Sequence, residues 1–195
     1  MKVELDEEMF AFYYERRLLL RPKMDIRTGS PSDAEAVAGL IARFQGELTD
    51  DPSGTGAERF LASVSVQAER EYLASARYRY LLAFSGPEFA GFIAIRDGSH
   101  LFHLFVGRAH QRQGLGRLLW QQALRELCSP NSEGFFTVNS SLSAVPVYRS
   151  FGFAPAGSTQ SVDGISFLPM RASSLANMRS NQAMERTADS GTLHF

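Results

Sequence analysis

Residues 106–117 read VGRAHQRQGLGR, and this segment carries the strongest functional signal in the chain. An apolar run ends at Val106, a polar loop follows, and Gly114 and Gly116 open a segment whose apolar residues have helical spacing. The first N–H groups of a helix have no partner inside it, and the helix dipole places partial positive charge there. Glycines also let a ligand approach the backbone closely. The segment therefore predicts a phosphate or pyrophosphate site at the start of a helix.

Two common phosphate-binding loops do not fit this segment. A P-loop would end in Gly-Lys followed by Ser or Thr, and residues 106–117 contain no Lys. A Rossmann loop would need a third glycine inside a parallel βαβ unit. The apolar runs before Val106 are instead separated by short turns at 85–88 and 97–98, which predicts an antiparallel meander. Two glycines alone can also form no more than a turn, so the surrounding elements decide.

The apolar spacing on either side of the loop predicts alternating helices and strands, with no internal repeat. Ser32 precedes Glu35 by three residues, which is the capping-box pattern at the start of a helix. In chain order, the predicted elements are a strand at 24–27, helices at 33–45 and 57–75, strands at 78–84, 89–96 and 100–106, a helix at 115–127, a strand at 135–138, a short helix at 144–151 and a strand at 165–170.

The composition is that of a globular protein and argues against several classes of function. The 195 residues are 44% apolar and 21% charged, and their formal net charge is -1. This balance is unlike the strongly basic domains that bind nucleic acid non-specifically. No apolar run approaches the roughly 18 residues of a transmembrane helix, and residues 1–21 lack the pattern of a signal peptide. A lone Cys128 without a metal-ligand cluster fits a cytoplasmic protein that has no metal site.

The chain divides into three predicted parts. Residues 1–23 form an N-terminal extension, either a short aromatic helix that packs on the domain or on a second subunit, or a frayed segment. A homodimer is therefore one possibility. Residues 24–170 form the folded domain, and residues 171–195, rich in Ser, Asn, Met, Thr and Ala, form a flexible tail.

Residues 106–117 resemble the signature of the GNAT superfamily of acyl-CoA N-acyltransferases, Gln/Arg-x-x-Gly-x-Gly/Ala between a strand and a helix, here Gln111 to Gly116. Residues 138–153, VNSSLSAVPVYRSFGF, look like the strand–helix segment of that family, which ends in Tyr-x-x-x-Gly-Phe. The element order also fits over residues 24–170. The resemblance implies an α+β (α/β), GNAT-like fold with a mixed, mostly antiparallel central sheet of six to seven strands, flanked by about four helices. It also implies acetyl-CoA as the cosubstrate.

The resemblance assigns the cofactor to the end of one strand and to the glycine loop. Residues 104–106 are expected to pair with the pantetheine arm, and residues 111–116 to hold the pyrophosphate. Asn139 lies where the family often contacts the cofactor. The implied cofactor-binding residues are Leu104, Phe105, Val106, Gln111, Arg112, Gln113, Gly114, Leu115, Gly116, Arg117, Asn139 and Tyr148. Arg108, Arg112, Arg117 and Arg125 lie in a stretch without acidic residues, which predicts a cationic cradle for the polyanion.

Tyr148 lies where many family members place the general acid. A phenol is a sensible donor to the CoA thiolate that leaves when an amine attacks the thioester. In the alternative interpretation Tyr148 only packs, because it shares a helix face with Ala144, Val147 and Phe151.

His100 and His103, both in the strand before Val106, are the candidate bases, since histidine titrates near neutral pH. The register of the family favours His100, and a β-bulge would change which histidine faces the cleft. Either could also be a surface residue, with a water chain as the base. His110 is expected to be a solvent-exposed loop residue.

The acceptor is an unidentified amine, and the sequence offers one indication of its nature. Glu47, Asp50 and Asp51 lie in a loop that borders the acceptor site in this family, and would attract a cationic small molecule or peptide. The alternative is an ordinary solvated loop. The favoured function is N-acetyl transfer by direct attack on acetyl-CoA. The rivals are transfer from a longer acyl-CoA or to an oxygen acceptor, and a degenerate acyl-CoA-binding regulatory module.

Overall fold

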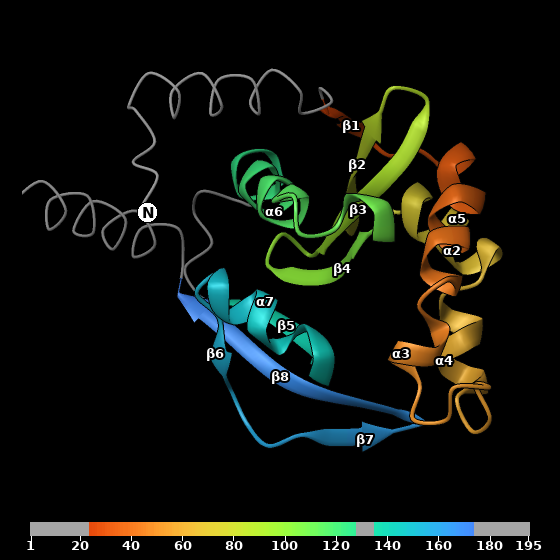
Figure 1. Cartoon of the computed structure of the whole chain (residues 1–195), viewed down its shortest axis with the longest axis vertical. Coiled ribbons are helices and arrows are strands. Elements are labelled where there is room, and N and C mark those ends of the chain that lie inside the picture. The colour runs from red at the N-terminus through yellow and green to blue at the C-terminus, as the bar shows by residue number, and fades with distance from the viewer. Residues whose placement is uncertain (1–23, 128–134, 174–195) are drawn as a thin grey trace, which may run out of the picture.

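The computed structural model describes residues 24–127 and 135–173 of the chain (Figure 1). The predicted extension at 1–23, Cys128 and the greater part of the predicted tail lie outside the described residues. The predicted elements between 24 and 170 can all be compared with the structure.

The predicted mixed, mostly antiparallel sheet is confirmed, with more strands than expected. Eight strands form one sheet in the order β1-β2-β3-β4-β5-β8-β6, with β7 paired to β8. The β4–β5 pair is parallel, and the other pairs are antiparallel. The strands are β1 (Met24–Thr28), β2 (Tyr78–Ser85), β3 (Glu88–Arg96), β4 (His100–Val106), β5 (Phe135–Ser141), β6 (Ala154–Pro155), β7 (Gln160–Val162) and β8 (Ile165–Ser173).

Two differences concern the last third of the sheet. The short strands β6 and β7 are absent from the sequence prediction, because each pairs with β8 through so few residues that no apolar alternation develops. β8 is also longer than predicted. Residues 171–173, assigned to the tail from their composition, continue the strand, and Ser173 pairs with Phe135 of β5.

The helices occur where they were predicted, with two differences: the helix predicted at 57–75 is divided into two, and a short helix at Gln45–Leu48 lies mostly in the segment predicted as a loop. The described helices are α2 (Ala34–Ala42), α3 (Gln45–Leu48), α4 (Glu58–Ser63), α5 (Val66–Ala74), α6 (Leu115–Glu126) and α7 (Val145–Ser150), with 3-10 turns η1 (Pro31–Asp33), η2 (Arg108–His110) and η3 (Leu142–Ala144).

Local capping explains where the helices begin. The predicted segment 57–75 breaks at Ser65, whose side chain accepts a hydrogen bond from the Ala68 N–H at 3.3 Å and so starts α5. The capping box that was predicted from Ser32 to Glu35 is wrong. It involves Ser30 and Asp33, because the chain first makes the η1 turn, and the Ser30 N–H donates to Asp33 Oδ2 at 2.8 Å.

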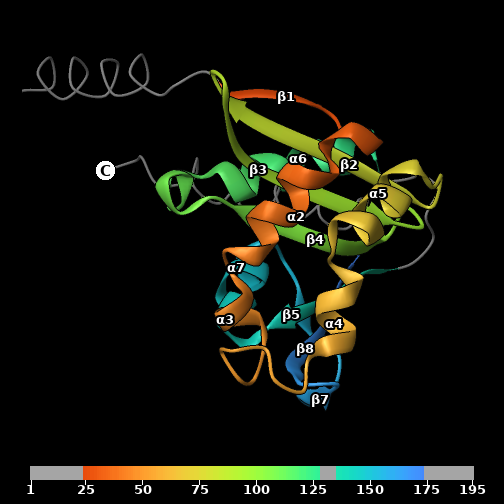
Figure 2. The same ribbon diagram turned by 90° about the vertical axis from the view of Figure 1, so that its right-hand side faces the viewer.

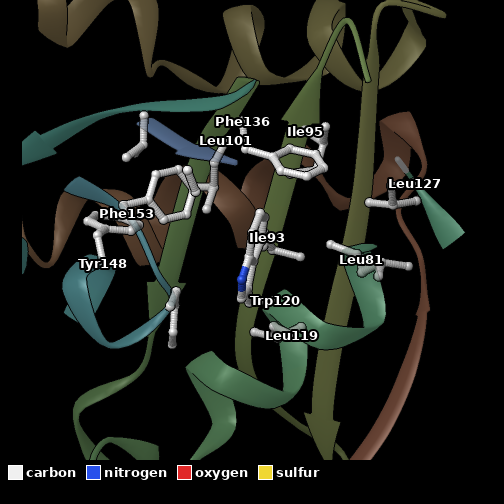
Figure 3. Close-up of a cluster of buried hydrophobic side chains, with 14 of the residues drawn as sticks. Leu81, Ile93, Ile95, Leu101, Leu119, Trp120, Leu127, Phe136, Tyr148 and Phe153 are labelled. Atoms are coloured by element: carbon white, nitrogen blue, oxygen red, sulfur yellow. The ribbon is translucent and has the colours of Figure 1, made fainter. Parts of the chain in front are cut away.

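The helices cover both faces of the sheet, and each face has its own apolar core. α2 and α5 lie on one face and α6 on the other (Figure 2). On the α6 face Trp120 packs edge-on against Phe136, with ring centroids 5.5 Å apart, and Leu119 and Ile93 are fully buried beside it (Figure 3). On the other face Phe92 stacks on Tyr80 and Phe105. These cores fix the sheet on both sides of the region where β4 and β5 meet.

β4 and β5 pair over a very short length. The register joins His100 to Thr137 and Leu101 to Val138, after which the two strands diverge. Phe102 has no partner on β3, since Leu101 pairs with Ile95 and the next pair is His103 with Ala94. This β-bulge places Phe102 and His103 on the same face of the sheet. The separation of β4 from β5 therefore begins at the bulge, and it leaves a space inside the sheet.

The turn between β7 and β8 is held against the loop that joins α3 to α4. The Asp50 N–H donates to the Gly164 carbonyl at 2.8 Å. Gly164 has a φ of 71°, and a Cβ atom there would lie 2.5 Å from the carbonyl carbon and oxygen of Gly56. The contact is thus made between backbones, and glycine is required on steric and conformational grounds.

Gly164→Ala is therefore expected to lower the free energy of unfolding by at least about 1 kcal/mol, since alanine is strained at this φ and clashes with a neighbouring backbone. Urea denaturation followed by circular dichroism measures the change. Gly157→Ala is the matched control, because a Cβ at Gly157 would meet no atom within 4 Å. An equal effect of the two substitutions would contradict the close contact.

Candidate active site

A cleft of about 780 Å³ occupies the space between the diverging ends of β4 and β5. It is lined by α3, α4, β4, the glycine loop, α6, β5, α7 and β8. The structure brings nearly all of the predicted site residues together in it. The predicted residues that line the cleft are His100, His103, Leu104, Phe105, Val106, Gln111, Arg112, Gly114, Leu115, Gly116, Arg117, Asn139 and Tyr148.

The glycine loop presents the start of α6 to this cleft. Gly114 has a φ of 85° and Arg112 a φ of 58°, so the loop turns twice through left-handed conformations before the helix begins. Two side chains of the loop stabilise its shape: Gln111 donates to the Val106 carbonyl at 3.0 Å, and Gln113 donates to the Ala109 carbonyl at 2.7 Å. Among the residues that the structure describes, no side chain caps the start of α6. The first N–H groups of α6 are thus available to a phosphate, and the fit to a pyrophosphate is good.

The arginines around this loop have different roles. Arg117 lies over the Phe151 ring, 5.6 Å from its centroid, and donates to the Ser150 carbonyl. The exposed Arg108 is engaged elsewhere, in an ion pair with Glu47. Arg125 lies in the last turn of α6, at the opposite end of the helix from the loop. The predicted cradle of four arginines is thus wrong in extent, and Arg112 and Arg117 are its members that line the cleft.

His103 belongs to a buried polar chain that the sequence reasoning missed. Its Nε2 lies 3.0 Å from Oε1 of Glu69, and the Tyr80 hydroxyl donates to Oε2 of the same carboxylate at 2.8 Å. The Glu69 side chain is 0% exposed. Burial, and then the Glu69 carboxylate, raise the pKa of Tyr80 far above its ordinary value. A signal did exist, because Glu69 precedes Tyr72 by three residues and so lies on its inward helix face.

His100 lies at the start of β4, and its Nδ1 is 2.8 Å from the Thr137 hydroxyl on β5. Burial, and secondly the charge of Arg96, lower the pKa of His100 to about 4. The imidazole is therefore neutral at physiological pH. Because it is engaged at the point where β4 and β5 are still paired, His100 contributes to joining the two strands.

The prediction that His110 is solvent-exposed is wrong. The η2 turn folds its ring back toward β3, and His110 is 7% exposed. Its Nε2 is 3.2 Å from a Glu88 oxygen, in a geometry too poor for a hydrogen bond.

Tyr148 lines the cleft and also belongs to the core. It is 7% exposed and meets Phe151 and Phe153 edge-on, with centroid distances of 6.3 and 5.9 Å (Figure 3). Burial raises the pKa of its phenol, which therefore keeps its proton throughout the physiological range. Both predicted interpretations of Tyr148, donor and packing residue, thus have a structural basis.

The acidic loop reaches the cleft at one position. Glu47 lines it, but its carboxylate pairs with Arg108, whose guanidinium also lies over the Phe44 ring, 5.1 Å from the centroid. Asp50 and Asp51 are not part of the lining. Asp51 instead accepts hydrogen bonds from Ser53, which lower the pKa of its carboxyl.

Comparison with known proteins identifies the family. A family model described as the acetyltransferase (GNAT) domain matches residues 48–174. The chain belongs to the GNAT acetyltransferase family. No curated protein matches the chain. As a GNAT protein it performs acyl-CoA-dependent acetyl transfer in the general sense of the family, and acetyl-CoA is its cosubstrate.

Solved GNAT structures confirm the fold. A GCN5-related N-acetyltransferase from Rhodopseudomonas palustris is 19% identical, with a TM-score of 0.62 over 76% of this chain and 94% of the other. The PaiA N-acetyltransferase from Thermoplasma acidophilum, solved with coenzyme A, is 16% identical, with a TM-score of 0.56 over 77% of this chain and 99% of the other. YjaB from Escherichia coli is 21% identical, with a TM-score of 0.54 over 76% and 97%. Among the described residues, this GNAT chain has no helix long and apolar enough to cross a bilayer.

Arg117→Ala is expected to weaken coenzyme A binding roughly 3- to 10-fold, because it removes a charge beside the uncapped end of α6. Isothermal titration calorimetry measures the dissociation constant. Arg125→Ala, at the far end of the same helix, is the matched control and should leave the constant unchanged. A larger loss from the Arg125 substitution would place the phosphates elsewhere.

Proposed function

We propose that the protein is an N-acetyltransferase that moves the acetyl group of acetyl-CoA directly to an amine. One observation supports catalysis and not cofactor binding alone. Where β4 and β5 part, His103 lines the cleft with the buried Glu69 carboxylate behind it, and Tyr148 lines the same cleft from α7. A module that only bound acyl-CoA would have no need of a buried carboxylate–histidine pair at this point.

The residues divide the work between binding and proton transfer. Backbone N–H groups of residues 111–116, with Arg112 and Arg117, bind the pyrophosphate, and Asn139 contacts the cofactor. Acetyl-CoA supplies an acetyl group activated as a thioester. Leu104, Phe105 and Val106 present the backbone of β4 to the pantetheine arm.

Proton transfer falls to His103 and Tyr148. His103, rather than His100, accepts the proton of the attacking amine, because His100 is tied to Thr137 and has a pKa of only about 4. Tyr148 holds a proton at its hydroxyl and donates it to the leaving sulfur.

The proposal has a test that separates it from its rivals. Thermal shift with acetyl-CoA, longer acyl-CoAs and CoA measures cofactor choice, and thiol release with a panel of amines measures transfer. Stabilisation by acetyl-CoA with thiol release supports the proposal. Stabilisation without any thiol release would indicate a binding module, and preference for a longer chain would indicate another acyl group.

Tyr148→Phe is expected to lower kcat roughly 10²-fold or more with little change in coenzyme A affinity, since only the proton donor is removed. Steady-state kinetics and calorimetry together measure both quantities. Phe153→Leu serves as a packing control in the same cluster. Unchanged kcat in the Tyr148 variant would leave Tyr148 as a packing residue.

Two parts of the proposal rest on the sequence. The lone Cys128 fits the reducing cytoplasm, and the aromatic extension at 1–23 fits a homodimer contact. Deleting residues 1–23 and measuring the mass in solution tests the second. A dimer that persists without them would assign the contact to another surface.

A further inference from the structure

One wall of the cleft carries many apolar side chains, with Ser63, Arg96 and Ser166 between them. Its residues on β4 lie on the same face of the sheet as His103, under α2–α5. The apolar wall consists of Phe44, Leu48, Phe60 and Val64 from the helical segment, Phe102 and Phe105 from β4, and Ile165 and Phe167 from β8.

The charges on this wall are already satisfied. Among residues 24–127 and 135–173, Glu47 is the one carboxylate that lines the cleft, and Arg108 neutralises it. Arg96 lies over the Phe102 ring, 5.5 Å from the centroid, and near Asp97. A polyamine or an amino sugar would bring extra ammonium or hydroxyl groups into contact with phenyl rings, where they would lose water without gaining a partner.

We infer that the acceptor is a primary monoamine on an apolar body, an arylalkylamine or alkylamine, whose nitrogen meets His103 and whose body lies against the apolar wall. The inference rests on the proposed N-acetyl transfer and names its substrate class. It removes the role suggested for the acidic loop in attracting the acceptor, because Asp50 and Asp51 lie outside the lining.

The test uses the full chain, saturating acetyl-CoA and thiol release with 2-phenylethylamine, a series from ethylamine to hexylamine, spermidine and glucosamine. We expect 2-phenylethylamine and hexylamine to exceed spermidine and glucosamine at least 10-fold in kcat/KM. The alkylamine series should rise roughly four-fold per methylene, the ratio that burial of a methylene gives. Preference for spermidine or glucosamine, or no dependence on chain length, would overturn the inference.

A binding measurement separates failure of the inference from failure of the proposed function. If no amine releases thiol, calorimetry with the CoA-loaded protein compares 2-phenylethylamine with spermidine. Tighter binding of 2-phenylethylamine then supports the inference that the apolar wall binds the amine, although the proposed transfer activity is wrong. Tighter or equal binding of spermidine rejects that inference. Phe60→Asn should weaken the binding of 2-phenylethylamine about 10-fold. Phe135→Asn, which changes an exposed residue outside the cleft, should leave this binding unchanged.

A second inference concerns the carboxylate behind His103 and stands on separate contacts. Glu69 lies in the first turn of α5, where the helix dipole favours a negative charge. Both of its oxygens are engaged, by His103 Nε2 and by the Tyr80 hydroxyl. Among the described residues no hydrogen bond engages Nδ1 of His103, and this atom is not sealed from solvent. The ring is thus fixed at one nitrogen and open at the other.

We propose that Glu69 is a positioning residue, which holds the proton of His103 on Nε2 so that the Nδ1 lone pair receives the proton of the amine. The carboxylate also balances the charge of the imidazolium formed in that step, so Glu69 both orients the ring and faces the charge that it acquires. Other ionisable groups around His103 are Tyr80 on β2, Arg96 on β3, His100 on β4 and Tyr72 on α5. Of these, Tyr80 donates to Glu69 and His100 is neutral, so Glu69 is the negative charge nearest to the ring.

Glu69→Gln tests this role, and the exposed Glu71→Gln on the same helix is the matched control. The glutamine variant should lose at least about 10-fold in kcat, a part of the roughly 10²–10⁴-fold that a positioned base supplies. Nitrogen NMR should show the Nε2–H tautomer of His103 in the parent protein, whether or not the protein acetylates amines. The Nδ1–H tautomer in the parent protein, or an unchanged kcat in Glu69→Gln, would overturn the proposal.

A second variant covers the case in which Glu69→Gln does not fold. Tyr80→Phe leaves Glu69 with His103 as its remaining hydrogen-bond partner, so nitrogen NMR should still show the Nε2–H tautomer of His103. Loss of that tautomer in a folded Tyr80→Phe variant would reject the proposal.

Discussion

The site depends on where the parallel pairing of β4 and β5 ends. Two residue pairs join the strands, and beyond Leu101 and Val138 each strand presents unpaired N–H and C=O groups to the space between them. An extended ligand arm can use such groups in the way that an added strand would. The bulge at Phe102 lies at the same point and turns His103 toward α5. This irregularity thus lies where the cleft opens, and it brings His103 to Glu69.

Much of the fold was predictable because its signals are local. The glycine loop, α6 and the meander of β2, β3 and β4 follow from turn residues and apolar spacing within short windows. The division of the helix predicted at 57–75 was missed because a Ser inside an apolar pattern does not reveal that it caps a helix. The short β6 and β7 depend on pairing with a distant strand, which no local pattern encodes.

Some residues of the candidate site could be predicted from local sequence motifs, and others could not. Motif residues such as Gly114 and Tyr148 follow from the resemblance, and they lie in the cleft. Glu69 was missed although its spacing from Tyr72 places it on the inward helix face, because charged residues normally face solvent and its burial requires partners from β2 and β4 that the sequence does not place beside it. The bulge places His103 beside Glu69. The sequence allowed such an irregularity but could not locate it, since Phe102 is an ordinary strand residue.

The contact between Gly164 and Gly56 has a consequence for how the protein can change over time. The loop before α4 and the turn before β8 hold each other through main-chain atoms, and the elements that follow them, α4 and β8, carry side chains that line the cleft. Because the contact between Gly164 and Gly56 is made by backbone atoms, residues such as Phe60 and Phe167 can be substituted without loss of this contact. The specificity for the amine can thus change without loss of the fold. A lineage with this architecture can diversify its acceptors while its cofactor chemistry is conserved.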